Sequence, residues 1–195
     1  LLALCLVMAL VPMTAFAEDT MDTWDGTADT SWYDENKTEF HLQAAEQLAG
    51  MAKLVNDNTA NFKDKTVYLD NDLDLDGHEW ISIGNGANTA WGSFQGIFDG
   101  QSHVVYNLYS HEGLKSENKD NNNNLYRNGL FGSIYNATVK NLGIENADIV
   151  IPMNDTSTYG KGILVDWMTH STINNCYTTG SITGGSYVEK YIGGI

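Results

Sequence analysis

The spacing of apolar residues divides the chain into one helix and many short strands. Within residues 43–56, apolar side chains recur at positions i, i+3, i+4 and i+7 from Leu48 to Val55, which is the pattern of a helix with one apolar face. Much of the remaining chain alternates apolar and polar residues over short runs, as half-buried strands do. The pattern therefore predicts a mainly β protein with a single amphipathic helix near its beginning.

The clearest alternation lies around residues 66–75. Apolar residues occupy the odd positions and aspartates the even ones: Val67, Leu69, Leu73 and Leu75 against Asp70, Asp72, Asp74 and Asp76. Because successive side chains of a strand point to opposite faces, we predict one half-buried strand with an acidic outer row. Further short strands are predicted at residues 38–42, 80–84, 94–100 and 103–108.

A short motif recurs at a fixed interval along the chain. Three segments align, with their asparagines 34 residues apart each time: Val105-Tyr106-Asn107-Leu108, Val139-Lys140-Asn141-Leu142 and Ile173-Asn174-Asn175-Cys176. A fixed period of this length is typical of repeat architectures. We predict that Asn107, Asn141 and Asn175 form a ladder on adjacent coils, with Leu108, Leu142 and Cys176 stacked beside it in the core. If the three asparagines do not lie on adjacent coils, the repeat interpretation fails.

These patterns favour a right-handed parallel β-helix over residues 38–195. Short strands, glycines at corners and asparagine before an inward apolar residue are the features that indicate this fold. The helix at 43–56 is then expected to cover the first end of the solenoid, whose strand edges and core side chains need a cap. A β-sandwich is the alternative, because its strand lengths and turns are similar.

The beginning of the chain has the composition of a secretory signal peptide. Residues 1–16 are almost wholly apolar, and Ala15-Phe16-Ala17 supplies small residues before an acidic segment. We expect residues 1–17 to be removed by cleavage after Ala17, leaving no membrane-inserted segment. Residues 18–37 form a polar segment, whose Trp24 and Trp32 are expected to close one end of the core. Stacking on sugar rings is the alternative role for these tryptophans.

Charge and cysteine content narrow the possible partners. The net charge is −15 and Arg127 is the only arginine, whereas nucleic acids and anionic membranes are bound by basic surfaces. We therefore expect neither partner, and we interpret the charge as a contribution to solubility.

Cys176 is the only cysteine after the signal peptide. Its alignment with Leu108 and Leu142 predicts a small, buried and unreactive thiol.

One segment resembles the first half of a calcium-binding loop. Asp72-Leu73-Asp74-Leu75-Asp76-Gly77 matches D-x-D-x-D-G, so Asp72, Asp74 and Asp76 are the candidate ligands. However, the position that requires a bidentate glutamate is Ile83, and the alternation indicates a strand. We favour a solvated acidic edge that discourages edge-to-edge pairing, and we expect no cofactor, with calcium as the alternative.

The order of motifs resembles that of bacterial surface proteins with GLUG-type repeats. Their glycine-leucine-any-glycine core is matched by Gly129-Leu130-Phe131-Gly132, and Gly162-Ile163-Leu164-Val165 departs from it, with Val165 in place of the closing glycine. Motifs upstream follow the same order in those proteins: residues 46–52, 55–56, 67–75, 80–84 and 94–100. The resemblance implies a secreted or wall-attached β-helix with an adhesive or scaffolding role and no catalytic residue to carry over. Such regions also occur in the N-terminal part of some immunoglobulin-cleaving metallopeptidases.

We therefore expect a non-catalytic adhesive or scaffolding module that binds an extracellular protein or glycan. The sequence contains no H-E-x-x-H and no G-x-S-x-G motif. A polysaccharide lyase or glycoside hydrolase is one alternative, with Asp70, Asp72 and Asp74 acting beside Arg127 or Lys140. The N-terminal region of a larger surface peptidase is the other alternative.

Overall fold

The computed structural model describes residues 23–86, 90–115, 126–155, 160–184 and 192–195. The predicted signal peptide, residues 1–17, and its cleavage site after Ala17 lie outside these ranges. Within them the chain forms one α-helix and many short strands, most of which pair in parallel. The prediction of a mainly β protein with one N-terminal helix is confirmed. No helix in the described ranges is long and apolar enough to cross a membrane.

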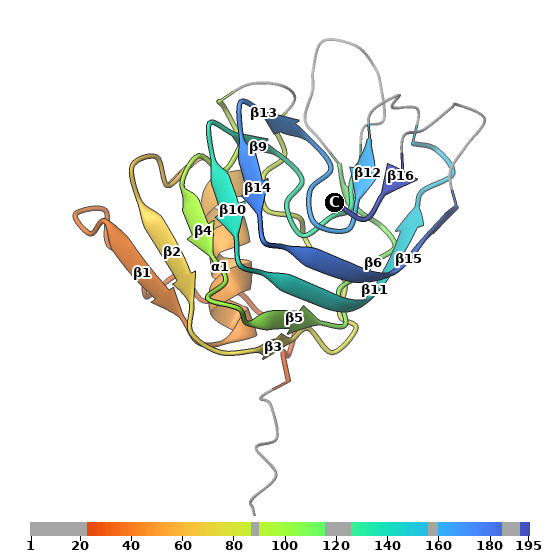
Figure 1. Cartoon of the computed structure of the whole chain (residues 1–195), viewed down its shortest axis with the longest axis horizontal. Coiled ribbons are helices and arrows are strands. Elements are labelled where there is room, and N and C mark those ends of the chain that lie inside the picture. The colour runs from red at the N-terminus through yellow and green to blue at the C-terminus, as the bar shows by residue number, and fades with distance from the viewer. Residues whose placement is uncertain (1–22, 87–89, 116–125, 156–159, 185–191) are drawn as a thin grey trace, which may run out of the picture.

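The first sheet contains five parallel strands whose order follows the chain (Figure 1). They are β1 (Glu39–Leu42), β2 (Thr66–Leu69), β4 (Ile97–Asp99), β10 (Thr138–Lys140) and β14 (Thr172–Asn174). One residue of each strand stands in a single paired row: Phe40, Val67, Phe98, Val139 and Ile173. The first four are buried and Ile173 packs against the core, so this row forms one wall of the interior.

The second sheet is reached from the first by short turns. It contains β3 (Leu73–Asp74), β5 (Val104–Tyr106), β11 (Gly143–Ile151) and β15 (Tyr177–Gly184), with β6 (Tyr109–Ser110) also paired to β11. Leu73, Val105 and Ile144 are paired in register and buried. In Figure 1 the chain turns a corner between β10 and β11, and it turns the same corner again between β14 and β15. The two sheets therefore enclose one apolar interior.

Shorter pairs complete the described strands. They are β9 (Ile134–Tyr135) with β13 (Met168–Thr169), β12 (Lys161–Gly162) with β16 (Ile192–Gly193), and the antiparallel pair β7 (Leu114–Lys115) with β8 (Tyr126–Arg127). Parallel bridges also connect Ile83 to Phe131 and Phe131 to Val165. A β-sandwich is made of antiparallel sheets, so the sandwich alternative does not fit these parallel pairings.

The strand predicted around residues 66–75 is two strands that belong to two sheets. β2 ends at Leu69 and β3 begins at Leu73. The inward residues were predicted correctly, because Val67, Leu69, Leu73 and Leu75 are all buried. The inward residues stay at odd positions on both sides of the turn between the strands. The hydrophobic pattern therefore does not show that the chain changes sheets.

Helix α1 (Ala45–Asn56) agrees with the predicted range 43–56, and its apolar face is buried. The segment before β1 crosses directly over it, because a Cβ atom at Gly50 would lie 1.8 Å from the carbonyl oxygen of Asp29. In the same segment Trp24 is buried and lies edge-to-face against Trp80, with ring centroids 5.6 Å apart. Trp32 also packs against the core. The two tryptophans of the N-terminal segment therefore serve the core, as predicted.

Candidate functional site

The structure brings together two of the three asparagines that were predicted to form a ladder. Asn141 and Asn175 follow the paired strands β10 and β14, and the Nδ2 group of Asn175 donates a hydrogen bond to Oδ1 of Asn141 at 2.9 Å. Asn141 in turn donates to Oδ1 of Asp99 at 2.9 Å. The row of hydrogen-bonded side chains therefore continues from Asn141 toward the N-terminal strands through Asp99.

Asn107 does not belong to this row, so the predicted three-membered ladder is wrong. Tyr106 pairs with Glu145, which places Asn107 beside Asn146 on the second sheet. The Nδ2 group of Asn107 donates to Asp74 at 2.7 Å. The 34-residue interval holds from β10 to β14, but Ile97 and Thr138 are 41 positions apart. The insertion between β6 and β9 lengthens that interval, so the equal spacing of Asn107 and Asn141 is a coincidence. The three asparagines lie on successive levels of paired strands but not at equivalent positions, so the repeat that was assigned from their spacing fails.

The residues that follow the three asparagines also fall into two groups, with Leu142 and Cys176 side by side and Leu108 apart from them. Gly143 pairs with Tyr177, so Leu142 stands beside Cys176, whereas Tyr109 pairs with Asp148, which puts Leu108 beside Ala147. Leu108 and Leu142 are buried, and Cys176 is half-buried against the core. Burial raises the pKa of the Cys176 thiol. This environment favours the protonated thiol over the reactive thiolate.

The glycine-bounded segments also align differently from the prediction. Val165 bridges to Phe131, so the closing glycine, Gly132, corresponds to Asp166 and not to Val165. The predicted alignment was wrong by one residue. Asp166 is buried, and its carboxylate accepts hydrogen bonds from the backbone N–H groups of Asn128 (2.7 Å) and Gly162 (3.0 Å). A buried carboxylate has thus taken the place of a glycine.

Two of the three calcium candidates, Asp72 and Asp74, use side-chain oxygen atoms in hydrogen bonds within the protein. Asp72 accepts from Nδ1 of His103 at 2.9 Å and from the backbone N–H of Val104 at 3.0 Å. Asp74 accepts from Asn107 and from the backbone N–H of Asp76. In the described part of the chain no three acidic, histidine or cysteine residues are arranged to hold a metal ion. The calcium alternative therefore has no support from the geometry of Asp72, Asp74 and Asp76.

The basic residues proposed for an enzyme alternative lie elsewhere. Arg127 is buried, and its guanidinium donates to the carbonyl oxygen of Gly86 at 2.9 Å. The Nζ atom of Lys140 lies 3.0 Å from Asp99. Asp70 is bonded to His41 at 2.9 Å instead. The described contacts of Arg127 and Lys140 are thus with Gly86 and Asp99.

Tyrosines and carboxylates form a patch on the outer surface of the second sheet, which we call the tyrosine patch. It consists of Asp72, His103, Tyr106, Glu145 and Tyr177. Tyr106 and Glu145 are paired across β5 and β11, and the hydroxyl of Tyr177 donates to Oε1 of Glu145 at 2.7 Å. The ring of Tyr177 lies on Gly143, where an added Cβ atom would come within 2.6 Å of it. Only glycine leaves room for this ring to lie flat on the strand.

The pKa values of both tyrosines in the patch are raised above the usual value. Burial raises the pKa of Tyr106, and the negative charges of Asp72 and Glu145 raise it further. The pKa of Tyr177 is raised chiefly by the hydrogen bond that it donates to Glu145. Tyr177 is 47% exposed. The patch therefore offers an accessible aromatic ring beside carboxylate oxygens that accept hydrogen bonds. The sequence predicted an acidic outer row that includes Asp72, but it did not indicate that Asp72 meets the tyrosines and Glu145 from distant segments.

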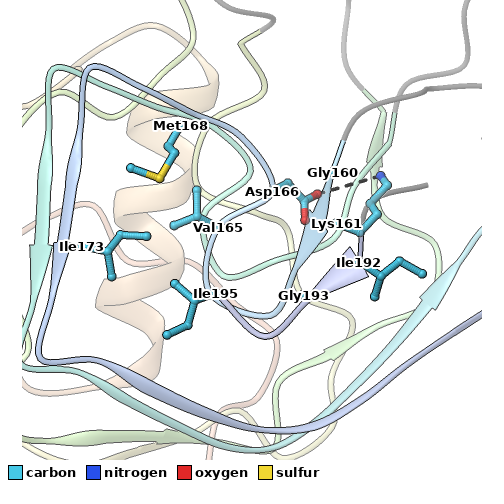
Figure 2. A pocket seen from close by; sticks show the side chains of 9 residues that line it. All are labelled: Gly160, Lys161, Val165, Asp166, Met168, Ile173, Ile192, Gly193 and Ile195. Atoms are coloured by element: carbon cyan, nitrogen blue, oxygen red, sulfur yellow. Dashed lines mark ion pairs between the residues drawn. The ribbon is translucent and has the colours of Figure 1, made fainter. Parts of the chain in front are cut away.

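A second group, the buried charged cluster, contains Arg127, Asp155, Lys161 and Asp166. The Nζ atom of Lys161 lies 3.0 Å from Oδ2 of Asp155 and 3.9 Å from Oδ2 of Asp166, and all three side chains are at most 1% exposed. Burial raises the pKa of Asp166, opposed first by the charge of Lys161 and then by that of Arg127. Figure 2 shows Lys161 and Asp166 at the edge of a pocket whose other side chains include Val165, Ile173 and Ile195. The pocket has a volume of about 360 Å³.

Comparisons with protein-family models, with curated proteins and with solved structures gave no match to this chain.

Proposed function

We propose that this chain is an adhesive or scaffolding module of a secreted or cell-surface bacterial protein. In this proposal the chain belongs with the GLUG-type repeat proteins and forms a right-handed parallel β-helix, whose first end is covered by helix α1. The parallel registers of the two main sheets support such a fold, as does the 34-residue displacement between β10 and β14. The failure of the three-copy repeat removes one argument for it, so the proposal rests on strand pairing.

The tyrosine patch is the observation that carries the proposed function. Its Tyr106, Glu145 and Tyr177 lie on strands β5, β11 and β15, and strands hold side chains in fixed positions better than loops do. The ring of Tyr177 is held in place by Gly143 beneath it and by Glu145 at its hydroxyl. A preorganised aromatic ring loses little entropy when a ligand binds on it. Sugar rings present apolar C–H faces for stacking and hydroxyl groups that donate to carboxylates, so we infer a glycan ligand.

The charge of the patch narrows the class of glycan. Asp72 and Glu145 are both acidic, and the chain carries a net charge of −15. Uronate-rich or sulfated polymers would be repelled by this surface. Neutral sugars and amino sugars would not be repelled, and a protonated amino group would be attracted. The proposed ligand is therefore a neutral or amino-sugar polymer.

Binding to immobilised glycans tests this proposal. Chitosan oligomers and neutral β-glucans should bind the chain, whereas polygalacturonate should not. Replacing both Tyr106 and Tyr177 by alanine should weaken binding about 10-fold or more, because aromatic stacking contributes about 1–3 kcal/mol per ring. Tyr135→Ala, which removes a half-buried tyrosine beside His170, is the matched control and should bind as the unmodified chain does. Equal binding by the double variant and the control would refute the assignment of the patch.

The same patch gives the enzyme alternative its strongest observation. Asp72 and Glu145 lie close enough to Tyr106 for both charges to raise its pKa. Two carboxylates beside a bound sugar are the groups that glycoside hydrolysis needs. Incubation with the same glycans, followed by assays for new reducing ends and for unsaturated products, distinguishes the two functions. Turnover that is lost in Glu145→Gln would replace the adhesive proposal by a catalytic one.

A further inference from the structure

Lys161 stands in an unusual environment for a lysine. Its side chain is 1% exposed, and lysine is rarely buried so fully. Its Nζ atom donates to the backbone carbonyl of Tyr126 and lies 3.4 Å from Oδ1 of Asn128. The closest carboxylate is that of Asp155, 3.0 Å away and 0% exposed. An amine nucleophile and a carboxyl group are therefore held in contact and shielded from bulk solvent.

We propose that Lys161 and Asp155 condense to an intramolecular isopeptide bond, with Asp166 transferring the proton. A proton first passes from the Lys161 ammonium to the Asp155 carboxylate, giving a neutral amine and a neutral acid. Nζ then attacks Cγ of Asp155 and forms the new C–N bond. Asp166 takes the proton from the attacking nitrogen and delivers it to the hydroxyl group on Cγ. The C–O bond breaks, one water leaves, and Asp166 returns to its starting state.

Burial favours the first step of this reaction. Keeping two charges out of water is costly, and the first step removes both of them. Nζ and Oδ2 are 3.0 Å apart, so the amine is held against the carboxyl group whose Cγ it attacks. Such positioning corresponds to effective concentrations on the order of 10⁵ M or more, which offsets the low reactivity of a carboxylic acid toward an amine.

The position and the pKa of Asp166 both suit it to proton transfer. Its Oδ2 atom lies 3.9 Å from Nζ, and backbone N–H groups of Asn128 and Gly162 fix the orientation of its carboxylate. Burial raises its pKa, which makes it a better proton acceptor during the attack. Condensation would also remove two buried charges and leave Arg127 and Asp166 as the remaining charges of the cluster. The reaction therefore relieves part of the cost of burying the cluster.

Mass spectrometry of the denatured full chain tests the proposal, once its N-terminus has been identified. The mass should be lower than that calculated from the sequence by one water. Trypsin should fail to cleave after Lys161, and the peptide should give no fragment ions between residues 155 and 161, because the bond closes this loop. Lys161→Arg keeps the charge but cannot form the bond, so it should have its full calculated mass.

Asp166→Asn separates proton transfer from mere proximity, since it leaves both reacting groups in place. It should show its full calculated mass while its far-UV circular dichroism spectrum remains that of the folded chain. If this variant does not fold, the mass of the unmodified chain still decides the main claim. A full calculated mass for the unmodified chain would show that Lys161 and Asp155 form only an ion pair. Loss of ammonia, with peptide 128–140 joined to Lys161, would identify Asn128 as the partner and refute Asp155. A lost water that persists in Lys161→Arg would place the dehydration elsewhere.

Discussion

At the scale of single residues, asparagine shapes this protein mainly through its backbone. Six described asparagines have φ between 49° and 59°. Asn58 follows helix α1, and the other five are Asn107, Asn136, Asn141, Asn146 and Asn175. This left-handed region is costly for most residues, but asparagine tolerates it. These five residues stand where the chain turns between strands or where β11 is irregular. The recurrence of asparagine in the sequence therefore indicates turns. Of the three asparagines that were predicted to form a ladder, only Asn141 and Asn175 contact each other.

Replacing Asn141 separates its backbone role from its side-chain bonds. Asn141→Ala loses the hydrogen bonds with Asp99 and Asn175 and places alanine at φ +55°. We expect the free energy of unfolding to fall by about 2–4 kcal/mol. Asn141→Gly loses the same bonds but adopts this φ without strain, so it should cost less. Urea denaturation of both variants measures the difference. Equal losses would mean that the left-handed backbone contributes nothing.

The carboxylate of Asp70 should make stability depend on pH in the acid range. Its pKa is lowered, first by the hydrogen bond from His41 and also by the one from Gln101. The native state thus binds this proton less readily than the unfolded chain does. The contribution is present above about pH 4 and is lost as the pH falls through the lower folded pKa. In Asp70→Asn the loss of stability between about pH 4 and about pH 2 should be smaller than in the unmodified chain, as measured by urea midpoints at each pH. Parallel pH profiles would contradict this assignment.

At the scale of elements, helix α1 is confined from both sides. Its apolar face joins the core, and the segment containing Asp29 crosses it at Gly50. The backbone N–H of Asp29 donates to the carbonyl oxygen of Glu46 at 2.8 Å, which ties this segment to the first turn of the helix. Glycine is a poor helix former, so its presence here is explained by the close approach of the two backbones.

Substitution of Gly50 by alanine should therefore destabilise the protein. In an exposed helix the same change stabilises by about 1 kcal/mol. Here the new methyl group would collide with backbone atoms of Asp29, and we expect a loss of about 1–3 kcal/mol in the free energy of unfolding. Lys53→Ala, at an exposed position of the same helix, is the control and should change stability by less than about 0.5 kcal/mol. An increase in stability for Gly50→Ala, measured by chemical denaturation, would show that the segment is not held against the helix.

At the scale of the whole molecule, the sheets and the helix share one core. Buried residues from α1, from both main sheets and from the glycine-bounded segment belong to a single apolar cluster. Each strand of the first sheet also pairs only with its neighbours in the sheet, in the order of the chain. Nearest-neighbour stacking allows units to unfold one after another, whereas a shared core favours one cooperative transition.

We expect one cooperative transition. Trp24 and Trp80 are buried near the N-terminal end of the fold. Trp167→Phe removes the tryptophan that comes last in the sequence, so that fluorescence reports mainly on the N-terminal end. Far-UV circular dichroism reports on all strands. The midpoints in urea from the two methods should coincide. A fluorescence midpoint clearly above or below the circular dichroism midpoint would show that the ends unfold separately, as the coils of a repeat protein do.

The sequence by itself determined the local features of this protein. The helix period placed α1 to within two residues, and alternation identified the inward residues of β2 and β3, because burial of apolar side chains imposes the period of each element. It did not determine the register between distant strands, which depends on the length of chain between them and on the packing that this chain permits. That is why Asn107 was assigned to the wrong row and Val165 to the wrong position.

Only the tertiary structure decided which chemical groups meet. Tyr106, Glu145 and Tyr177 come from three strands, and nothing in their spacing indicates that one ring lies beside another strand's carboxylate. Lys161 and Asp155 are six positions apart, but their burial depends on the sheets around them. Alternation is a property of each strand and is written in its sequence. Contacts between side chains across strands arise from the pairing of strands, and that pairing is set by the fold as a whole.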